Sequence, residues 1–379
     1  MKSRRDRPSE SEESQDSGDE NVAALCLVRS EGIGPATFHH LITRYGSAIA
    51  ALAALPELER RNGRSSRRVY SETRAREEID ALDALGARLL AHGDCAYPQS
   101  LATLPDAPPM VSVMGRGDLL RRPAIAIVGA RNASSAGIRF PRTLAGELGE
   151  AGFAVVSGLA RGIDSAAHLG SLATGSIAVL AGGIDQVYPP ENDSLQQSLA
   201  DRGLLLAEQR VGTQPRARHF PTRNRLISGL SLGVVVVETA CRSGSLITAR
   251  CALDQGREVF AVPGSPLDPR CRGRNEFIRD GAVLVQTIDD IISIFAPPRQ
   301  AARGSSAFPQ GNEISPNRSA DEYDRMQHRV ASALGPTPVT VDELMRQCQL
   351  TPPELLTILH EFETAGRLQR HPGNRVSYL

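Results

Sequence analysis

The chain has almost no lysine. Lys2 is the one lysine among 379 residues, and every other residue counted as basic is an arginine. Schiff-base catalysis and the phosphate-binding loop of P-loop nucleotidases both need a lysine in a folded site. Because Lys2 lies in a polar terminal segment, the sequence argues against both mechanisms. Arginine can still hold phosphate, since its planar guanidinium donates to two oxygens at once.

Paired cysteines and long apolar runs are also missing. The six cysteines are scattered with no Cys-x-x-Cys pair, which argues against a zinc site and a disulfide framework. No apolar run reaches the roughly 18 residues that span a membrane, and the polar N-terminus is unlike a secretory signal. We therefore expect a cytoplasmic protein of two or three domains, without membrane contact.

Composition divides the chain into five segments. The first is a Ser/Glu/Asp-rich tail that cannot bury enough apolar surface to offset the entropy of ordering. The fourth is rich in Pro, Ser, Gly and Asn, as linkers are. The predicted boundaries are 1–20 for the disordered tail, 21–85 for a helical domain, 86–297 for an extended Rossmann-like domain, 298–320 for the linker and 321–379 for a winged-helix domain.

The helical domain contains a turn that is typical of helix–hairpin–helix (SAM-like) folds. Apolar residues recur at helical spacing on both sides of residues 31–35 (EGIGP). The glycines permit a tight turn whose N–H groups could approach a phosphate. The turn carries no basic residue, so a packing role is favoured over DNA contact.

Short apolar runs alternate with helical stretches in the central segment. Continuous apolar runs indicate strands that are covered on both faces, and the alternation predicts an α/β fold with a Rossmann-like, doubly wound parallel sheet. Ligands of such sheets bind beyond the carboxyl ends of the strands. The predicted strands are 124–128, 153–156, 177–180, 203–206, 233–237 and 258–262.

The C-terminal segment predicts three helices and a terminal hairpin, which together make a winged helix. The third helix, roughly 352–365, carries Glu354, Glu361 and Glu363 and no arginine. A recognition helix of that charge would be repelled by duplex phosphates. We therefore expect this domain to bind protein, or to touch DNA weakly through its arginine-bearing hairpin.

Small and basic residues follow one predicted strand after another in the central domain. Glycine lets backbone N–H groups approach an anion, and a following helix N-terminus adds its dipole. Several such loops at one sheet edge predict a phosphate site, whereas the G-x-G-x-x-G of nicotinamide and flavin enzymes is absent after the first strand, so no cofactor is expected. The loop candidates are Gly129, Arg131, Ser157, Gly158, Arg161, Gly182, Ser243, Gly244 and Ser245.

Arginines concentrate in two further stretches of the same domain. An electrostatic groove with a stacking aromatic is what single-stranded nucleic acid requires, and a solvated loop in an arginine-rich protein is the competing interpretation. The ring of Phe220 could equally fill a core or hinge position. The first stretch contains Arg210, Arg216, Arg218, His219, Phe220, Arg223, Asn224 and Arg225, and the second Arg270, Arg272, Arg274 and Arg279.

Three acid–base candidates are better explained as structural residues. Asp164 and His168 are four residues apart and could face each other on a helix. We favour the interpretation that Asp164 is a helix N-terminal aspartate and His168 a structural histidine over the interpretation that they form a catalytic pair. Glu238 ends the most apolar strand, and we expect it to hold its own loop by accepting backbone N–H bonds.

An ordered run of motifs in the central domain resembles the DNA-processing protein A (DprA, also called Smf) family. The resemblance implies a protein that binds single-stranded DNA cooperatively as a homodimer, protects it and loads RecA recombinase during natural transformation, with no established catalysis or cofactor. It also implies that Arg131 and the stretch from Phe220 to Arg225 belong to the DNA pocket. The motifs are 127–131 (IVGAR), 156–168 (VSGLARGIDSAAH), 219–231 (HFPTRNRLISGLS), 238–240 (ETA), 243–249 (SGSLITA) and 262–265 (VPGS).

Two other functions compete with this one. The fold also resembles phosphoribohydrolases of the lysine-decarboxylase-like group, but their Pro-Gly-Gly-x-Gly-Thr-x-x-Glu pattern is absent, and residues 243–245 follow Glu238 instead of preceding it. A transcription regulator acting through the winged helix is disfavoured by the acidic third helix.

Overall fold

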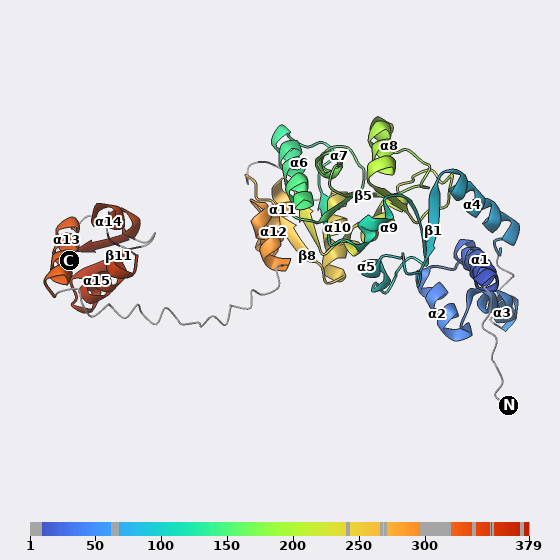
Figure 1. Ribbon diagram of the computed structural model, residues 1–379, viewed down its shortest axis with the longest axis horizontal. Helices are drawn as coiled ribbons and strands as arrows, with labels where there is room; N and C mark the ends of the chain where they lie inside the picture. Colours follow the sequence, from blue (N-terminus) through green and yellow to red (C-terminus); the bar gives the residue numbers. More distant parts are fainter. Residues whose placement is uncertain are drawn as a thin grey trace, which may run out of the picture. The chain divides into compact units, whose positions relative to one another are not determined.

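The structure is a computed structural model that divides into two compact units, residues 1–295 and 296–379 (Figure 1). Residues 1–9 of the expected tail and 298–319 of the expected linker lie outside the described residues. The structure describes residues 10–61, 68–239, 243–265, 268, 271–295, 320–335, 339–348, 350, 352–371 and 375–378.

Four helices form the N-terminal part of the first unit: α1 (Glu10–Arg29), α2 (Pro35–Tyr45), α3 (Ala48–Arg61) and α4 (Glu72–Ala84). Their apolar faces meet in one core, which extends to Met110 at the sheet. Helix α1 begins at Glu10, within the segment expected as a disordered tail, and the domain boundary itself stays a prediction. Two acidic residues of this helix have partners: Asp19 pairs with Arg76 at 3.0 Å, and Glu20 accepts from the Ala48 N–H.

The predicted hairpin turn joins α1 to α2. Gly32 has φ of 72°, a left-handed conformation that favours glycine. Pro35 occupies the first position of α2, where its missing N–H costs nothing. Ile33 between them is buried in the helical core, which fits the packing role expected for this turn.

The central sheet has nine strands in the order β1-β2-β6-β5-β4-β3-β7-β8-β9. All six predicted strands are present and parallel to their neighbours within the set: β3 (Ala124–Val128), β4 (Ala154–Ser157), β5 (Ser176–Leu180), β6 (Leu204–Ala207), β7 (Gly233–Val236) and β8 (Glu258–Ala261). Three strands were not predicted: the antiparallel pair β1 (Ala87–Ala91) and β2 (Met110–Gly115), and the short β9 (Val283–Leu284). The α/β, Rossmann-like fold class is confirmed.

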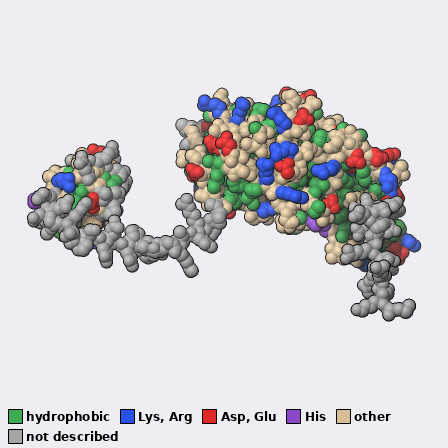
Figure 2. Space-filling view, viewed as in Figure 1, with side chains coloured by type: hydrophobic (Ala, Val, Ile, Leu, Met, Phe, Trp, Pro, Cys, Tyr) green, Lys and Arg blue, Asp and Glu red, His purple; other side chains and the backbone are tan. Residues whose placement is uncertain are grey.

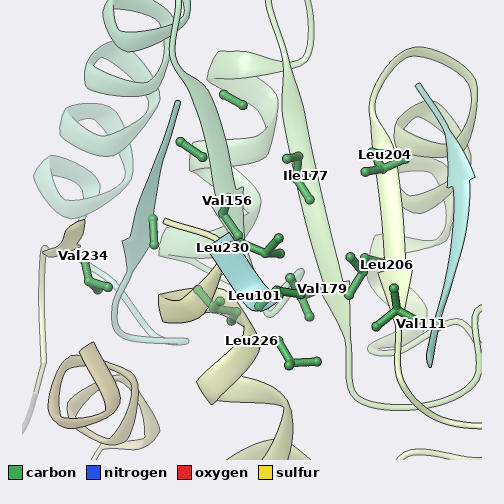
Figure 3. Packing of buried hydrophobic residues seen from close by; sticks show 14 of the residues in the cluster. Leu101, Val111, Val156, Ile177, Val179, Leu204, Leu206, Leu226, Leu230 and Val234 are labelled. Atoms are coloured by element: carbon green, nitrogen blue, oxygen red, sulfur yellow. The ribbon is translucent and has the colours of Figure 1, made fainter. Parts of the chain in front are cut away.

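Helices cover both faces of the sheet, as a doubly wound fold requires. One face carries α6 (Ser135–Glu150), α7 (Ile163–Ser171), α8 (Asp193–Arg202) and α12 (Ile288–Phe295). The other carries α5 (Gln99–Ala102), α9 (His219–Gly229), α10 (Gly244–Asp254) and α11 (Arg272–Arg279). Figure 3 shows the core under this second group of helices, where Leu226 of α9 and Leu230 just after it pack with Leu101 of α5 against Val156 and Val179 of the sheet.

The chain reverses its winding direction between β3 and β7. From β3 it proceeds through β4 and β5 to β6 on one side, and β7 to β9 lie on the other. The loops that follow β3 and β7 therefore diverge to opposite faces, and this leaves a crevice at the carboxyl ends of the strands. The crevice is the expected ligand site of the fold.

The second unit is a winged helix. The three predicted helices are α13 (Ala320–Ala333), α14 (Val341–Cys348) and α15 (Pro352–Thr364), followed by the predicted hairpin of β11 (Leu368–His371) and β12 (Arg375–Tyr378). One additional strand, β10 (Val339–Thr340), pairs with β12. The core of this second unit includes Val330, Leu344 and Leu355. No helix in the described part of either unit is long and apolar enough to cross a membrane.

Candidate nucleic-acid interface

A cavity of about 640 Å³ opens at the switch point between β3 and β7. Three segments supply most of its wall: the loop after β3, the first turns of α9 and the start of α10. Eight of the residues predicted as a DNA site line it, namely Gly129, Arg131, Phe220, Arg223, Asn224, Ser243, Gly244 and Ser245. The structure therefore brings together loops that lie more than 100 residues apart in the sequence.

The loops are shaped so that backbone N–H groups can lie at the cavity. At Gly129 a Cβ would lie 2.6 Å from Ile163 of α7, so glycine allows the first loop to pack closely on that helix. Ser243 caps α10, its Oγ accepting from the Ser245 N–H at 3.3 Å. The helix dipole of α10 favours an anion at this end, although the N–H groups of Ser245 and Leu246 are already bonded to Ser243.

Arg131 and Phe220 form the exposed rim of the cavity. The guanidinium carbon of Arg131 lies 5.2 Å from the centroid of the half-buried Phe220 ring, a cation–π contact. No described carboxylate lies within ion-pair distance of Arg131, so its charge is available to an incoming anion. Phe220 lines the cavity itself and is no ordinary core residue.

The floor of the cavity is polar but already hydrogen-bonded. Arg223 is only 6% exposed and donates to the carbonyl oxygens of Gly158, at 2.7 Å, and Val179. Burial lowers the pKa of Arg223 to about 10. Asn224 donates to the Gly244 carbonyl at 3.2 Å and so ties α9 to α10. These residues fix the shape of the floor, while Arg131 is the cation offered at the rim.

Asp164 and His168 are structural residues, as the sequence favoured. Asp164 accepts from the N–H groups of Gly158 at 3.2 Å and Ala160 at 3.3 Å, and burial raises its pKa. His168 bonds the Ser176 hydroxyl through Nδ1 at 2.8 Å instead of facing Asp164. Burial, with a contribution from Arg223, lowers the pKa of His168 to about 3, so the imidazole is neutral in the folded protein.

Glu238 accepts backbone N–H bonds, but from a different loop than expected. Its carboxylate accepts from the Ser134 N–H at 2.9 Å and from the Ser134 hydroxyl. Ser134 is the N-cap of α6, so Glu238 stabilises the start of that helix. A residue larger than glycine at Gly137 would collide with the same carboxylate. The expectation that Glu238 holds its own loop was wrong.

Five predicted site residues are used inside the protein instead of at the cavity. Ser157 is buried and donates to the Ile127 carbonyl at 2.6 Å. Gly158 and Gly182 are covered, the first by Arg223 and the second by Thr213 and Pro215, so neither offers its face to a phosphate. His219 is buried in the first turn of α9.

Arg225, the fifth, forms an ion-pair cluster on the other side of α9. It donates to Glu208 at 2.6 Å and to the Asp106 carbonyl at 2.8 Å, and its side chain is 12% exposed. Its partner Glu208 is 17% exposed, and burial raises the pKa of that carboxyl although Arg225 opposes the rise. Arg225 thus has a structural role in this chain, and its predicted contact with DNA stays a prediction.

The remaining predicted residue, Arg161, is exposed but does not line the cavity. It lies 3.5 Å from Glu191, which belongs to the loop after β5. Sequence reasoning also left out three polar residues that do line the cavity: Asn132, Asp164 as a binding-site residue, and Thr248. Thr248 follows Gly244 by one helical turn, and that spacing was the available signal.

The second arginine stretch does not form a groove in the described residues. Arg274 is buried and donates to the Val237 carbonyl, and Arg279 pairs with Glu276 on the surface of α11. Arg270 and the side chain of Arg272 lie outside the described residues. On the face seen in Figure 2 the basic side chains form separate groups mixed with acidic ones, so charge alone does not locate a site.

The comparisons with known proteins agree with this architecture. Family models match three ranges: DNA recombination-mediator protein A over residues 88–296, a DprA-like N-terminal HHH domain over 18–81 and a DprA winged helix domain over 315–374. The chain belongs to the DprA family. The predicted family, the helix–hairpin–helix and the winged helix are thereby confirmed, whereas the exact domain boundaries stay a prediction.

Relatives and solved structures of DprA proteins cover most of the first unit. The chain is 38% identical over 285 residues to Protein Smf of Escherichia coli, covering 74% of each protein. It is 44% identical over 204 residues to DprA of Streptococcus pneumoniae, 53% of this chain and 72% of that protein. The solved S. pneumoniae DprA has a TM-score of 0.55 at 38% identity, covering 59% of this chain and 77% of that one.

A second solved structure concerns the single-stranded DNA binding mode of DprA from Helicobacter pylori. It has a TM-score of 0.51 at 29% identity, covering 55% of this chain and 95% of that one.

Proposed function

We propose that this DprA-family chain binds single-stranded DNA at the cavity between β3 and β7, protects it and passes it to a RecA-type recombinase during natural transformation. The proposal describes a binding protein that works as a homodimer without a cofactor. The relatives support it, since the H. pylori DprA is described as binding single-stranded DNA. The family model is that of a recombination mediator.

The observation that carries the proposal is the pairing of Arg131 with Phe220 above the start of α10. The arginine offers a charge that no described carboxylate neutralises, and the start of α10, which lines the same cavity, offers the positive end of its helix dipole. The ring beside them offers a face to a base, whatever its identity. This combination suits a sequence-tolerant DNA binder.

The geometry favours a single strand over a duplex. The aromatic contact is made by Phe220, which is half-buried in the cavity wall, so a base must enter the cavity to reach its face. The bases of a duplex are stacked and paired, and extracting one costs a few kcal/mol. A single strand does not bear that cost.

The competing nucleotide-processing enzyme lacks an available acid or base in the described wall of the cavity. Asp164 accepts two backbone N–H groups, and Glu238 is occupied at the start of α6. Both carboxylates thus hold the frame of the site. Release of free base from nucleoside monophosphates would nevertheless establish the enzyme and displace the binding proposal.

The test is fluorescence anisotropy of a labelled dT oligomer and an equal-length duplex across a salt series. We expect wild type to prefer the single strand and Arg131→Ala to bind it roughly tenfold more weakly, with the log–log salt slope reduced by about 0.7 for one lost phosphate contact. Arg60→Ala removes an exposed arginine of α3, which pairs with Glu57, and serves as the control. Binding that favours duplex, or that ignores Arg131, would contradict the proposal.

The recombinase and dimer steps have separate measurements. RecA filament formation on single-stranded DNA covered by a single-strand-binding protein should speed up when wild type is added and not when Arg131→Ala is added. Sedimentation of the DNA-free protein reports the homodimer.

A further inference from the structure

Tyr188 is the one exposed Phe or Tyr among the side chains whose burial the structure describes. It is 42% exposed, whereas the other Phe and Tyr side chains of that set are buried or half-buried. The loop that carries it lies between β5 and α8, and the neighbouring Val187 is also exposed. An exposed ring costs solvation free energy, because apolar surface is left in water. A binding role would account for its position.

The ring of Tyr188 lies directly beside the cavity. Its centroid is 5.5 Å from that of Phe220, and the two planes are tilted by 59°. Phe220 in turn lines the cavity and lies under Arg131. Tyr188 therefore continues the aromatic surface from the rim outward.

The loop that carries Tyr188 is anchored on both sides. Asp185 accepts from the Gly212 N–H at 2.9 Å, and Gln196 of α8 donates to the Gln186 carbonyl at 3.3 Å. Pro189, the next residue after Tyr188, is buried. Because the loop is already fixed, a ligand that uses the ring loses little binding free energy to ordering it.

A cation lies at the same loop. Arg161, predicted from the sequence as a DNA contact, lies 3.5 Å from Glu191, and both side chains are about 60% exposed. Exposed ion pairs of this kind contribute about 0–1 kcal/mol, so Arg161 can exchange Glu191 for a phosphate at small cost. Single-stranded DNA that leaves the cavity across Tyr188 would next meet Arg161.

We infer that Tyr188 is a second stacking platform, which takes the nucleobase next to the one held at Phe220. This inference rests on the proposed function and deepens it. The DNA then runs from the anion site at α10 across Phe220 to Tyr188, with one phosphate near Arg131 and another near Arg161. The bound unit is at least two adjacent nucleotides, of any sequence, since each base has a face to stack.

The test exploits a feature of the composition: the chain contains no tryptophan. Tyr188→Trp therefore places a single fluorescent reporter at the platform. We expect its emission to be quenched by a dT oligomer and not by an abasic oligomer of the same length, which has the phosphates without the bases.

Affinity measurements on the same oligomers complete the test. Tyr188→Ala should bind dT roughly 5- to 100-fold more weakly with an unchanged salt slope, because stacking is lost and no charge is removed. Tyr188→Phe should bind like wild type, since the ring is kept. Leu85→Ala truncates a side chain of similar exposure, 43%, in the turn between α4 and β1 and is the matched control.

The outcomes separate the two proposals. If Tyr188→Ala binds dT like wild type while Arg131→Ala is weakened, the second platform is overturned and the proposed function stands. If Tyr188→Phe is as weak as Tyr188→Ala, the hydroxyl acts and stacking is overturned. If folded wild type binds no single-stranded DNA, both proposals fall. Thermal melting of each variant shows that the loss does not come from unfolding.

Discussion

Arg131 and Arg225 belong to the same α/β unit and differ in what surrounds their guanidinium groups. Arg131 lies at the cavity rim over an aromatic ring, without a described carboxylate partner. Arg225 lies between Glu208 and Asp106 and is almost covered. Both look alike in the sequence, because each is an arginine in a motif shared with DNA-binding proteins. The comparison shows that a cation marks a binding site only where the fold leaves it without a partner.

The arginines near Arg225 also have carboxylate partners, in contrast to Arg131. Arg29 of α1 donates to Glu78 of α4 at 2.8 Å and to the Glu208 carbonyl at 3.2 Å. Arg210, on the loop after β6, reaches the other oxygen of Glu78 at 3.5 Å. This cluster joins the helical domain to the sheet. Its arginines are held in ion pairs with Glu78 and Glu208, unlike Arg131, for which no described carboxylate partner is found.

The largest expected effect is on stability, from Arg225→Ala. The change leaves Glu208 largely buried without its partner, and breaking such a pair costs about 3 kcal/mol. We expect urea unfolding to show this loss, while the folded variant binds dT within about twofold of wild type. The double variant Arg225→Ala/Glu208→Gln should recover part of the stability, because the uncompensated charge is gone. A large loss of affinity at unchanged stability would instead put Arg225 on the DNA.

The second largest expected effect is on the pH dependence of the unfolding free energy. It extends the comparison to a buried residue in the layer beneath the cavity. His168 has a folded pKa of about 3 against 6.5 for the free side chain, so between these values the unfolded state binds more protons. Stability from this group is therefore present above pH 6.5 and is lost as pH falls, by about 2 kcal/mol between pH 7 and pH 5.

Urea unfolding of wild type and His168→Gln at both pH values isolates that contribution. The raised pKa values of Asp164 and Glu208 act in the opposite sense, but they are common to both proteins. The difference in unfolding free energy between the two proteins should shrink at pH 5. An unchanged difference would mean that His168 is not held neutral by the fold.

The smallest expected effect is in the winged helix. The Arg367 guanidinium lies 5.6 Å from the Phe362 ring and 5.4 Å from the Tyr378 ring, so it has partners within its own unit, as Arg225 has in the first. Arg367→Ala should lower the stability of this unit by about 0.5–1 kcal/mol. Affinity for dT should not change, and a clear decrease would place the hairpin on the DNA.

Much of the fold was predictable because its signals are local. Continuous runs of Val, Ile and Ala marked β3, β4, β5 and β7, and the winged helix followed from three helical periods and a hairpin. The antiparallel β1 and β2 were missed because they are less uniformly apolar. They pair through the register Leu89 with Ser112, which local periodicity does not reveal.

The site was predictable only to the level of its loops. Gly129, Arg131 and Phe220 were correctly expected to meet, since the carboxyl ends of parallel strands share one edge. The sequence could not separate Arg131 from Arg223 and Arg225, because burial and partners such as Glu208 come from distant segments. Tyr188 was not considered, because its exposure and its nearness to Phe220 exist only in the folded chain.

The two edges of the sheet bear on whether copies of this protein can associate through their strands at high local concentration. An open edge strand presents unpaired N–H and C=O groups to any neighbouring edge, and long flat edges invite aggregation. Here one edge is the two-residue β9, and the other is β1, against which α4 and the helical core pack. Neither edge offers a long ladder of unpaired N–H and C=O groups to a second sheet. Copies that bind side by side on DNA, as proposed, therefore need not aggregate through their β-strands.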